Sequence, residues 1–247
     1  LGVRVPDPAP YGRLVRAPDG ELLRIVEAKD ATPEERRIDF VNSGVMAFDA
    51  DGFFALLERI QPQNAEKEFY LTDAIALARQ AGRKARVVEG SVEEWLAAND
   101  RAELAVLENV FQTRARNAAM AAGVTLVDPA SVWFSHDTVI GAETVVYPSV
   151  FFGPGTAVGA GVTIKGFCHF EGVRVADGAT VGPFSRLRPG ADIGAGAHIG
   201  NFVEIKNATV EAGAKINHLS YVGDARVGAK ANLGAGTITC NYDGFGK

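Results

Sequence analysis

The sequence is poor in cysteine and lacks any excess of basic residues, and each shortage excludes a class of protein. Its two cysteines, Cys168 and Cys240, form neither a disulfide framework nor a metal-spacing motif. The formal net charge is -5, whereas nucleic-acid-binding domains usually carry a basic face. No apolar run approaches the roughly 20 residues that span a bilayer, and no signal peptide is visible at the start. We therefore expect a cytoplasmic protein that binds neither nucleic acid nor membrane.

An aliphatic or aromatic residue returns at every sixth position over more than a third of the chain. A helical period of 3.6 and a strand alternation of 2 both fail to give a strict six. The pattern predicts a parallel β-helix of hexapeptide repeats, with three repeats and about 18 residues in each coil. The series, with slips of one residue before Val175, Val210 and Val227, is Phe134, Ile140, Val146, Phe152, Val158, Ile164, Phe170, Val175, Val181, Leu187, Ile193, Ile199, Ile205, Val210, Ile216, Val222, Val227 and Leu233.

The first hundred residues have a different composition and predict an α/β segment. A turn at 17–20 indicates a hairpin, and a further strand is expected over 39–46. Thr72 is a good N-cap for a helix that ends at Gly82. A second helix is expected from Asn99 or Asp100 to Gly123, where about 22 residues would span about 33 Å and connect two domains. We place the domains at 1–101 and 124–247, with a helical linker at 102–123.

The regular positions of the repeat are core positions and carry no chemistry, so reactive groups must lie where the pattern is interrupted. Polar residues cluster at 186–190, 201–206 and 217–221. These segments are one or two coils apart if a coil takes about 18 residues, so they can converge on one edge of the prism.

Long motifs in both halves make a resemblance to one bacterial enzyme family specific. In the β-helix they are RLRPGA, GNFVEIKNA, INHLSYVGDA and NLGAGTITCNYDGFGK, and before it YGRLVR, IVEAKDAT, FVNSGV, EFYLTDAIALA and AANDRAEL. Over essentially its whole length the chain resembles the bifunctional N-acetylglucosamine-1-phosphate uridyltransferase and glucosamine-1-phosphate N-acetyltransferase. The resemblance implies a left-handed β-helix, a homotrimer with sites built from neighbouring chains, and a Rossmann-like nucleotidyltransferase segment in front. The product would be UDP-N-acetylglucosamine for peptidoglycan and lipopolysaccharide.

The resemblance also implies a role for each matching residue of the β-helix. His218 would be the general base that takes a proton from the 2-amino group of glucosamine 1-phosphate, because only the free amine can attack acetyl-CoA. Arg188 and Lys206 would hold the sugar phosphate through charge-assisted hydrogen bonds. His136, His169 and His198 are interpreted as surface or packing residues. The remaining matches are Tyr221, Asn232 and Lys247 for the sugar phosphate, Ala235, Asn241 and Tyr242 for acetyl-CoA, and Glu204 for orienting the site.

In the front segment the resemblance implies contacts to UDP-N-acetylglucosamine from Gly12, Glu27, Asn42 and Asn99. Asn99 would also be a ligand of Mg²⁺, which binds a few protein oxygens together with phosphates. From the residues alone, each of these four is equally a turn, strand-end or cap residue, and Asn99 could cap the connecting helix.

The family's glycine-rich UTP-binding loop and metal-binding aspartate are not found in front of the matching motifs, and its last coils are not found after them. We therefore expect an internal fragment without uridyl transfer and with weak or absent acetyl transfer. Two alternatives stay open: a non-catalytic trimeric scaffold, and another hexapeptide acyltransferase that acylates a serine or a lipid precursor.

Overall fold

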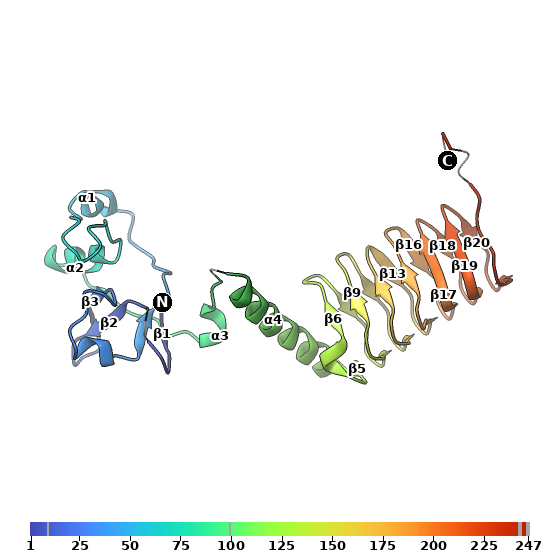
Figure 1. Cartoon of the computed structure of the whole chain (residues 1–247), viewed down its shortest axis with the longest axis horizontal. Helices are drawn as coiled ribbons and strands as arrows, with labels where there is room; N and C mark the ends of the chain where they lie inside the picture. Colours follow the sequence, from blue (N-terminus) through green and yellow to red (C-terminus); the bar gives the residue numbers. More distant parts are fainter. Residues whose placement is uncertain (9, 99, 242–243, 246–247) are drawn as a thin grey trace. The chain divides into compact units, whose positions relative to one another are not determined.

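The computed structural model describes residues 1–8, 10–98, 100–241 and 244–245 (Figure 1). Two compact units divide the chain, Leu1–Leu107 and Glu108–Lys247, and each is described by itself. None of the helices in the described ranges is both long and apolar enough to cross a membrane.

The first unit is built on a four-stranded antiparallel sheet with the order β1-β4-β2-β3. The predicted hairpin is confirmed, since β2 pairs antiparallel with β3 across a turn in which Gly20 has φ +88°. The strand expected over 39–46 is shorter and ends at Asn42. The elements are β1 (Gly2–Arg4), β2 (Arg13–Arg16), β3 (Leu22–Val26), β4 (Phe40–Asn42), α1 (Phe53–Leu57), α2 (Asp73–Gln80) and α3 (Val92–Trp95), with a 3-10 turn at Glu35–Arg37.

Thr72 occupies the N-cap position of α2 as predicted, but its side chain does not cap the helix. Its hydroxyl donates instead to Glu27 Oε1 at 3.1 Å, so it joins the helix to the residue that follows strand β3. The C-terminal end follows the prediction, because Gly82 has φ +77°, a left-handed conformation that glycine adopts without steric cost.

The second unit begins within helix α4 (Arg101–Ala121) and continues as the predicted left-handed parallel β-helix (Figure 1). Its short strands stack in parallel on three faces, one strand per face in each coil. The first face holds β5 (Thr125–Leu126), β8 (Val145–Val146), β11 (Thr163–Ile164), β14 (Thr180–Val181) and β21 (Asn232–Leu233). The second face holds β6 (Trp133–Phe134), β9 (Phe151–Phe152), β12 (His169–Phe170) and β15 (Arg186–Leu187). The third face holds β7 (Val139–Ile140), β10 (Ala157–Val158), β13 (Val173–Val175), β16 (Ala191–Ile193), β18 (Thr209–Val210) and β20 (Arg226–Val227).

Two strands are longer than the rest and turn the corner from the first face to the second. They are β17 (His198–Lys206) and β19 (Lys215–Gly223), of nine residues each. The one-residue slips of the repeat reappear as coils of 17 residues, since Val158 pairs with Val175 and Val210 with Val227. The slips in the sequence therefore predict the register of the stacked coils.

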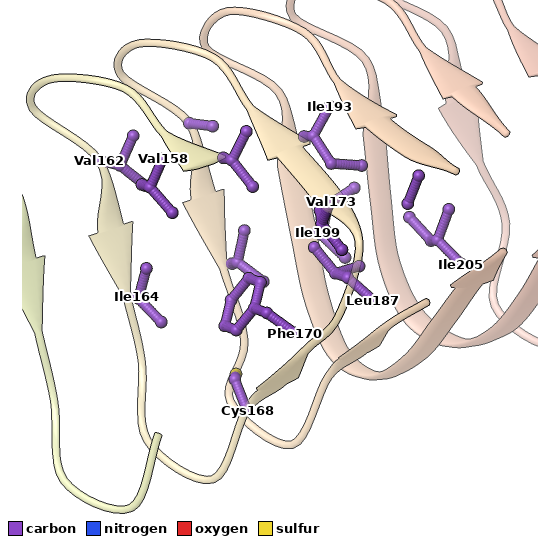
Figure 2. Packing of buried hydrophobic residues seen from close by; sticks show 14 of the residues in the cluster. Val158, Val162, Ile164, Cys168, Phe170, Val173, Leu187, Ile193, Ile199 and Ile205 are labelled. Atoms are coloured by element: carbon purple, nitrogen blue, oxygen red, sulfur yellow. The ribbon is translucent and has the colours of Figure 1, made fainter. Parts of the chain in front are cut away.

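The repeated residues form one continuous core along the axis of the β-helix. Figure 2 shows Ile164, Phe170, Leu187 and Ile193 pointing into the interior from strands β11, β12, β15 and β16. All four side chains are fully buried. The ring of Phe152 stacks on that of Phe170 with centroids 5.3 Å apart, so the core is held by contacts between coils as well as within them.

Helix α4 closes the first coil with polar side chains, which the apolar pattern of the sequence does not predict. Gln112 is 2% exposed; its amide donates to Phe134 O at 2.7 Å and accepts from Phe134 N at 2.9 Å. Arg116 Nε donates to Val132 O at 2.9 Å. These bonds satisfy the open edge of β6, which would otherwise present unpaired backbone groups. At the start of the helix, Asp100 accepts from Glu103 N at 2.8 Å and so acts as its cap.

Four apolar residues form an exposed ridge between the first and second faces, and we call it the apolar corner. Phe167, Phe184, Phe202 and Leu219 are 47–61% exposed and all have positive φ. Adjacent rings stack at 4.9 Å for Phe167 and Phe184 and at 5.4 Å for Phe184 and Phe202. Positive φ is unfavourable for bulky residues, and an exposed apolar ridge exposes surface to water. The row of exposed apolar side chains is therefore the unusual feature of this corner.

The two thiols are expected to differ sharply in reactivity. Cys168 lies in the core and is 2% exposed, and burial raises the pKa of its thiol to about 11. Only about one thiol in a thousand would then be ionised at pH 8, whereas Cys240 is exposed. Peptide mass spectrometry after brief treatment with iodoacetamide should find the label on Cys240 and not on Cys168. Labelling of both in guanidinium chloride is the control, and equal native labelling would contradict the burial of Cys168.

Candidate functional site

The polar segments converge on the second face of the β-helix, where β15, β17 and β19 stack side by side. Arg186 pairs with Glu204, and Glu204 pairs with Tyr221 on the next coil. Lys206 pairs with Gly223 at the end of the same strands. The corner between the faces brings Asn201 beside His218. We call the surface that extends from His218 at the corner to Lys206 at the strand ends the polar face.

His218 lies at the corner end of the polar face with an exposed side chain. Its Nδ1 is 2.8 Å from Oδ1 of Asn201, which belongs to the preceding coil. Because an amide oxygen can only accept, Nδ1 carries the hydrogen in this contact. The other ring nitrogen, Nε2, then keeps its lone pair, and the imidazole can accept a proton from a ligand.

Arg188 and Glu204 form an ion pair on the same face, with Arg188 Nη1 2.8 Å from Glu204 Oε1. Both side chains are 34% exposed, so the pair is open to solvent on one side. A guanidinium offers five N–H donors, and one bond to Glu204 leaves others for an anion. The arrangement can therefore bind a phosphate dianion while the carboxylate fixes the guanidinium.

The remaining predicted residues of the β-helix lie on later coils. Asn232 begins β21 on the first face, where it pairs with Lys215 and is separated from the polar face by the corner. Ala235 is exposed. Asn241 Nδ2 donates to Gly223 O at 2.8 Å, so its amide holds the end of the polar face. Tyr242 and Lys247 lie outside the described residues.

Two neighbours of the site were not identified from the sequence. Asn201 stands 17 residues before His218, which is the coil length at that point, and this spacing is the signal that could have revealed it. His198 lies three residues before Asn201 on β17. Partial burial, helped by the cations of Lys165 and Lys215, lowers the pKa of His198, so it stays neutral more readily than a free histidine.

In the first unit the structure brings together three of the four predicted nucleotide-sugar contacts. Gly12 O accepts from Asn42 N at 2.8 Å. A β-carbon at Gly12 would lie 3.2 Å from both carboxylate oxygens of Glu27, so glycine permits this close approach. Glu27 also lines a cavity of about 280 Å³ together with Tyr70 and Thr72. Asn99 lies outside the described residues.

The described residues do not by themselves provide a metal centre. Within the described ranges no three or more His, Cys, Asp or Glu side chains gather at one point. Glu27 lines its cavity together with Asp30 and Asp73, and it already accepts a hydrogen bond from Thr72. The predicted Mg²⁺ ligand Asn99 is not among the described residues, so the fit of a magnesium ion to this segment stays a prediction.

Comparison with known proteins finds one family model and several curated relatives that are similar to this sequence. The family model described as bacterial transferase hexapeptide (six repeats) matches residues 172–207, which include the first strands of the polar face. Curated relatives from Paramagnetospirillum magneticum and Rhodospirillum rubrum, each named Bifunctional protein GlmU, are 60% identical over all 247 residues. One from Xanthobacter autotrophicus with the same name is 56% identical. The chain spans only about half of these relatives, 55% of each.

Solved structures give a more distant similarity. The acetyltransferase domain of PglB from Neisseria gonorrhoeae, in complex with acetyl coenzyme A, matches 56% of this chain and 65% of its own length. Its identity is 20% and its TM-score is 0.17. A perosamine N-acetyltransferase variant from Caulobacter crescentus matches 65% of this chain and 82% of its own, with 14% identity and a TM-score of 0.21. Similarity at this level carries no conclusion about function.

Proposed function

We propose that this chain serves the two-step synthesis of UDP-N-acetylglucosamine that its sequence motifs imply. In support, its whole length matches 55% of the length of each relative named Bifunctional protein GlmU. The observation that carries the proposal is the polar face, where a histidine with a free ring nitrogen and a paired arginine lie two coils apart. Residues 124–247 would transfer the acetyl group, 1–101 would belong to the uridyltransferase domain, and 102–123 would link them. Two free cysteines suit a cytoplasmic protein.

In the acetyl transfer, Nε2 of His218 removes a proton from the 2-amino group of glucosamine 1-phosphate. The nitrogen lone pair attacks the carbonyl carbon of acetyl-CoA, and a carbon–nitrogen bond forms. The carbon–sulfur bond then breaks, and CoA leaves as a thiolate that takes up a proton. Asn201 holds Nδ1 and leaves Nε2 unprotonated, which is the state that a base requires.

The substrate phosphate would be bound by Arg188 and Lys206, with Tyr221 beside them on the next coil. Arg188 is held by Glu204, so its guanidinium is oriented before the substrate arrives. We assign Asn232 to the sugar phosphate and Ala235 and Asn241 to acetyl-CoA. Lys247 and Tyr242 complete the two groups in the same proposal.

In the uridyl transfer, the phosphate of N-acetylglucosamine 1-phosphate attacks the α-phosphorus of UTP and pyrophosphate leaves. We assign Gly12, Glu27 and Asn42 to the nucleotide sugar, because backbone and side-chain oxygens gather there beside a cavity. Mg²⁺ bound with Asn99 would supply charge neutralisation of the phosphates. The described residues bind and orient the sugar.

A homotrimer of this chain is the proposed assembly, and the apolar corner supports it. Phe202 follows Asn201 directly, and Leu219 follows His218 directly. A second copy that packs on the corner would therefore cover the histidine end of the polar face. Burial of the four side chains in a protein interface would offset their exposure and part of their backbone strain.

The double substitution Phe184→Glu and Phe202→Glu is expected to convert a trimer into monomers, because each interface would then bury two carboxylates without partners. Sedimentation equilibrium of the full-length protein measures the change. Val139→Glu is the matched control, since Val139 is 63% exposed on the third face. A trimer that survives the double substitution would exclude the corner as its interface.

Release of CoA thiol from acetyl-CoA by the full-length protein tests the acetyl transfer. We expect turnover with glucosamine 1-phosphate and none with N-acetylglucosamine 1-phosphate, which has no free amine. Release of pyrophosphate from UTP with the acetylated sugar tests the second step. No thiol release with either sugar would favour a scaffold, and turnover only with a serine or lipid acceptor would favour another hexapeptide acyltransferase.

A further inference from the structure

The contact between Asn201 and His218 joins two coils at one point of the polar face. The residues are directly opposite each other in the parallel pairing of β17 and β19. Their side chains meet at 2.8 Å, Nδ1 to Oδ1. Asn201 is half-buried and His218 is exposed. The amide is therefore fixed on the more enclosed side, and the ring extends from it toward solvent.

Both residues are held at the backbone by buried serine hydroxyls. Ser185 is 2% exposed, and its hydroxyl donates to Gly200 O at 2.6 Å, immediately before Asn201. Ser220 is 5% exposed, and its hydroxyl donates to His218 O at 2.8 Å. The amide and the imidazole thus stand on two anchored backbones, which is what a fixed hydrogen bond between side chains needs.

The backbones also approach closely just before the pair. A β-carbon at Gly200 would collide with the carbonyl oxygen of Asn217, the residue that precedes His218. Glycine at this position therefore permits the spacing at which Asn201 reaches His218. The contact depends on three features of three successive coils: the glycine, the serines and the 17-residue register.

We propose that Asn201 is a positioning residue that selects the Nδ1-protonated tautomer of His218. Asn201 touches no reacting atom; it accepts the Nδ1 hydrogen and so leaves the Nε2 lone pair for the substrate. An imidazole in the opposite tautomer would present Nε2–H and could not take the proton of an amine. The inference rests on the proposed acetyl transfer for its consequence, but the tautomer can be measured without it.

Nitrogen-15 NMR of histidine-labelled full-length protein reads the tautomer directly above pH 8, where a free imidazole is neutral. We expect Nδ1 of His218 to be protonated in the wild type. Asn201→Leu, which has no acceptor, should shift His218 toward the Nε2-protonated form. Asn201→Asp keeps an acceptor and should retain the wild-type tautomer. His136 and His169 serve as internal controls, since their signals should not move.

The same two variants should also differ in kcat for acetyl transfer. Asn201→Leu is expected to lower kcat for acetyl transfer by about 10-fold or more, within the 10²- to 10⁴-fold range of a general base, and Asn201→Asp should recover most of that loss. An Nε2-protonated His218 in the wild type would overturn the proposal, even if Asn201→Leu failed to fold. Unchanged tautomer and kcat in Asn201→Leu would also overturn it. A tautomer shift in a protein without acetyl transfer would uphold the positioning role and refute the function.

Discussion

Substitution of His218 by alanine is expected to lower kcat for acetyl transfer by about 10²- to 10⁴-fold. The methyl group cannot take the proton of the attacking amine, and no described residue replaces the imidazole at the corner, where Asn201 is its partner. The KM for glucosamine 1-phosphate should change little, because the phosphate would be bound by Arg188 and Lys206. Thiol release from acetyl-CoA in the full-length protein gives both constants.

His136→Ala is the matched control for that experiment. His136 follows the first strand of the second face, far along the axis from the polar face, and its ring is near the Ser135 hydroxyl. Its removal should leave kcat within about twofold of the wild type, since it contacts no proposed substrate group. Equal rates for the His218 variant and the wild type would exclude His218 as the base.

The second large effect is expected in the core, where Phe152→Ala should cost about 3–5 kcal/mol of unfolding free energy. Phe152 is fully buried between two other rings, with centroids 5.4 Å from Phe134 and 5.3 Å from Phe170. Its removal leaves a cavity between three coils that the backbone pairings prevent from closing. Chemical denaturation followed by far-ultraviolet circular dichroism measures the loss.

Phe151→Ala removes a phenylalanine ring at the preceding position and provides the control. Phe151 is 44% exposed and stacks on His169 at 4.8 Å, outside the core. We expect a loss below about 1 kcal/mol, because an exposed ring gives up little buried area. Similar losses for the two variants would mean that the register places the wrong residue in the core.

The six-residue period predicted the β-helix because it reflects a purely local requirement, one inward side chain per short strand. Its slips even gave the register, since each marks a coil of 17 residues. The closure by α4 was not predictable in this way. Gln112 and Arg116 are polar, and patterns of apolar residues assign such side chains to the surface, whereas here they bind the backbone of the first coil.

Sequence motifs proposed residues for the candidate site but did not predict the contacts between them. Motif resemblance named His218, Arg188 and Glu204, and the fold places them on one face. The bonds that join Asn201 to His218 and Arg188 to Glu204 cross between coils, one over 17 residues and the other over 16. Such partners depend on the side-chain directions at a corner, and a period cannot supply those. Thr72 is a second case in which the position was predicted and the partner was not. Its hydroxyl donates to the carboxylate of Glu27 and does not cap the helix.

The amide of Gln112 caps the first strand of the second face and so defines where the stack of coils on that face begins. It makes with Phe134 the two hydrogen bonds that another coil would make, so no further coil can be added in front. Five strand pairings then lead along the second face from β6 to β19. At about 4.8 Å per pairing, the proposed base lies about 24 Å along the axis from that first strand. Insertion or deletion of one whole coil would change the distance between the site and this end of the β-helix by one strand spacing, about 4.8 Å. The number of coils therefore sets the position of the site along the axis.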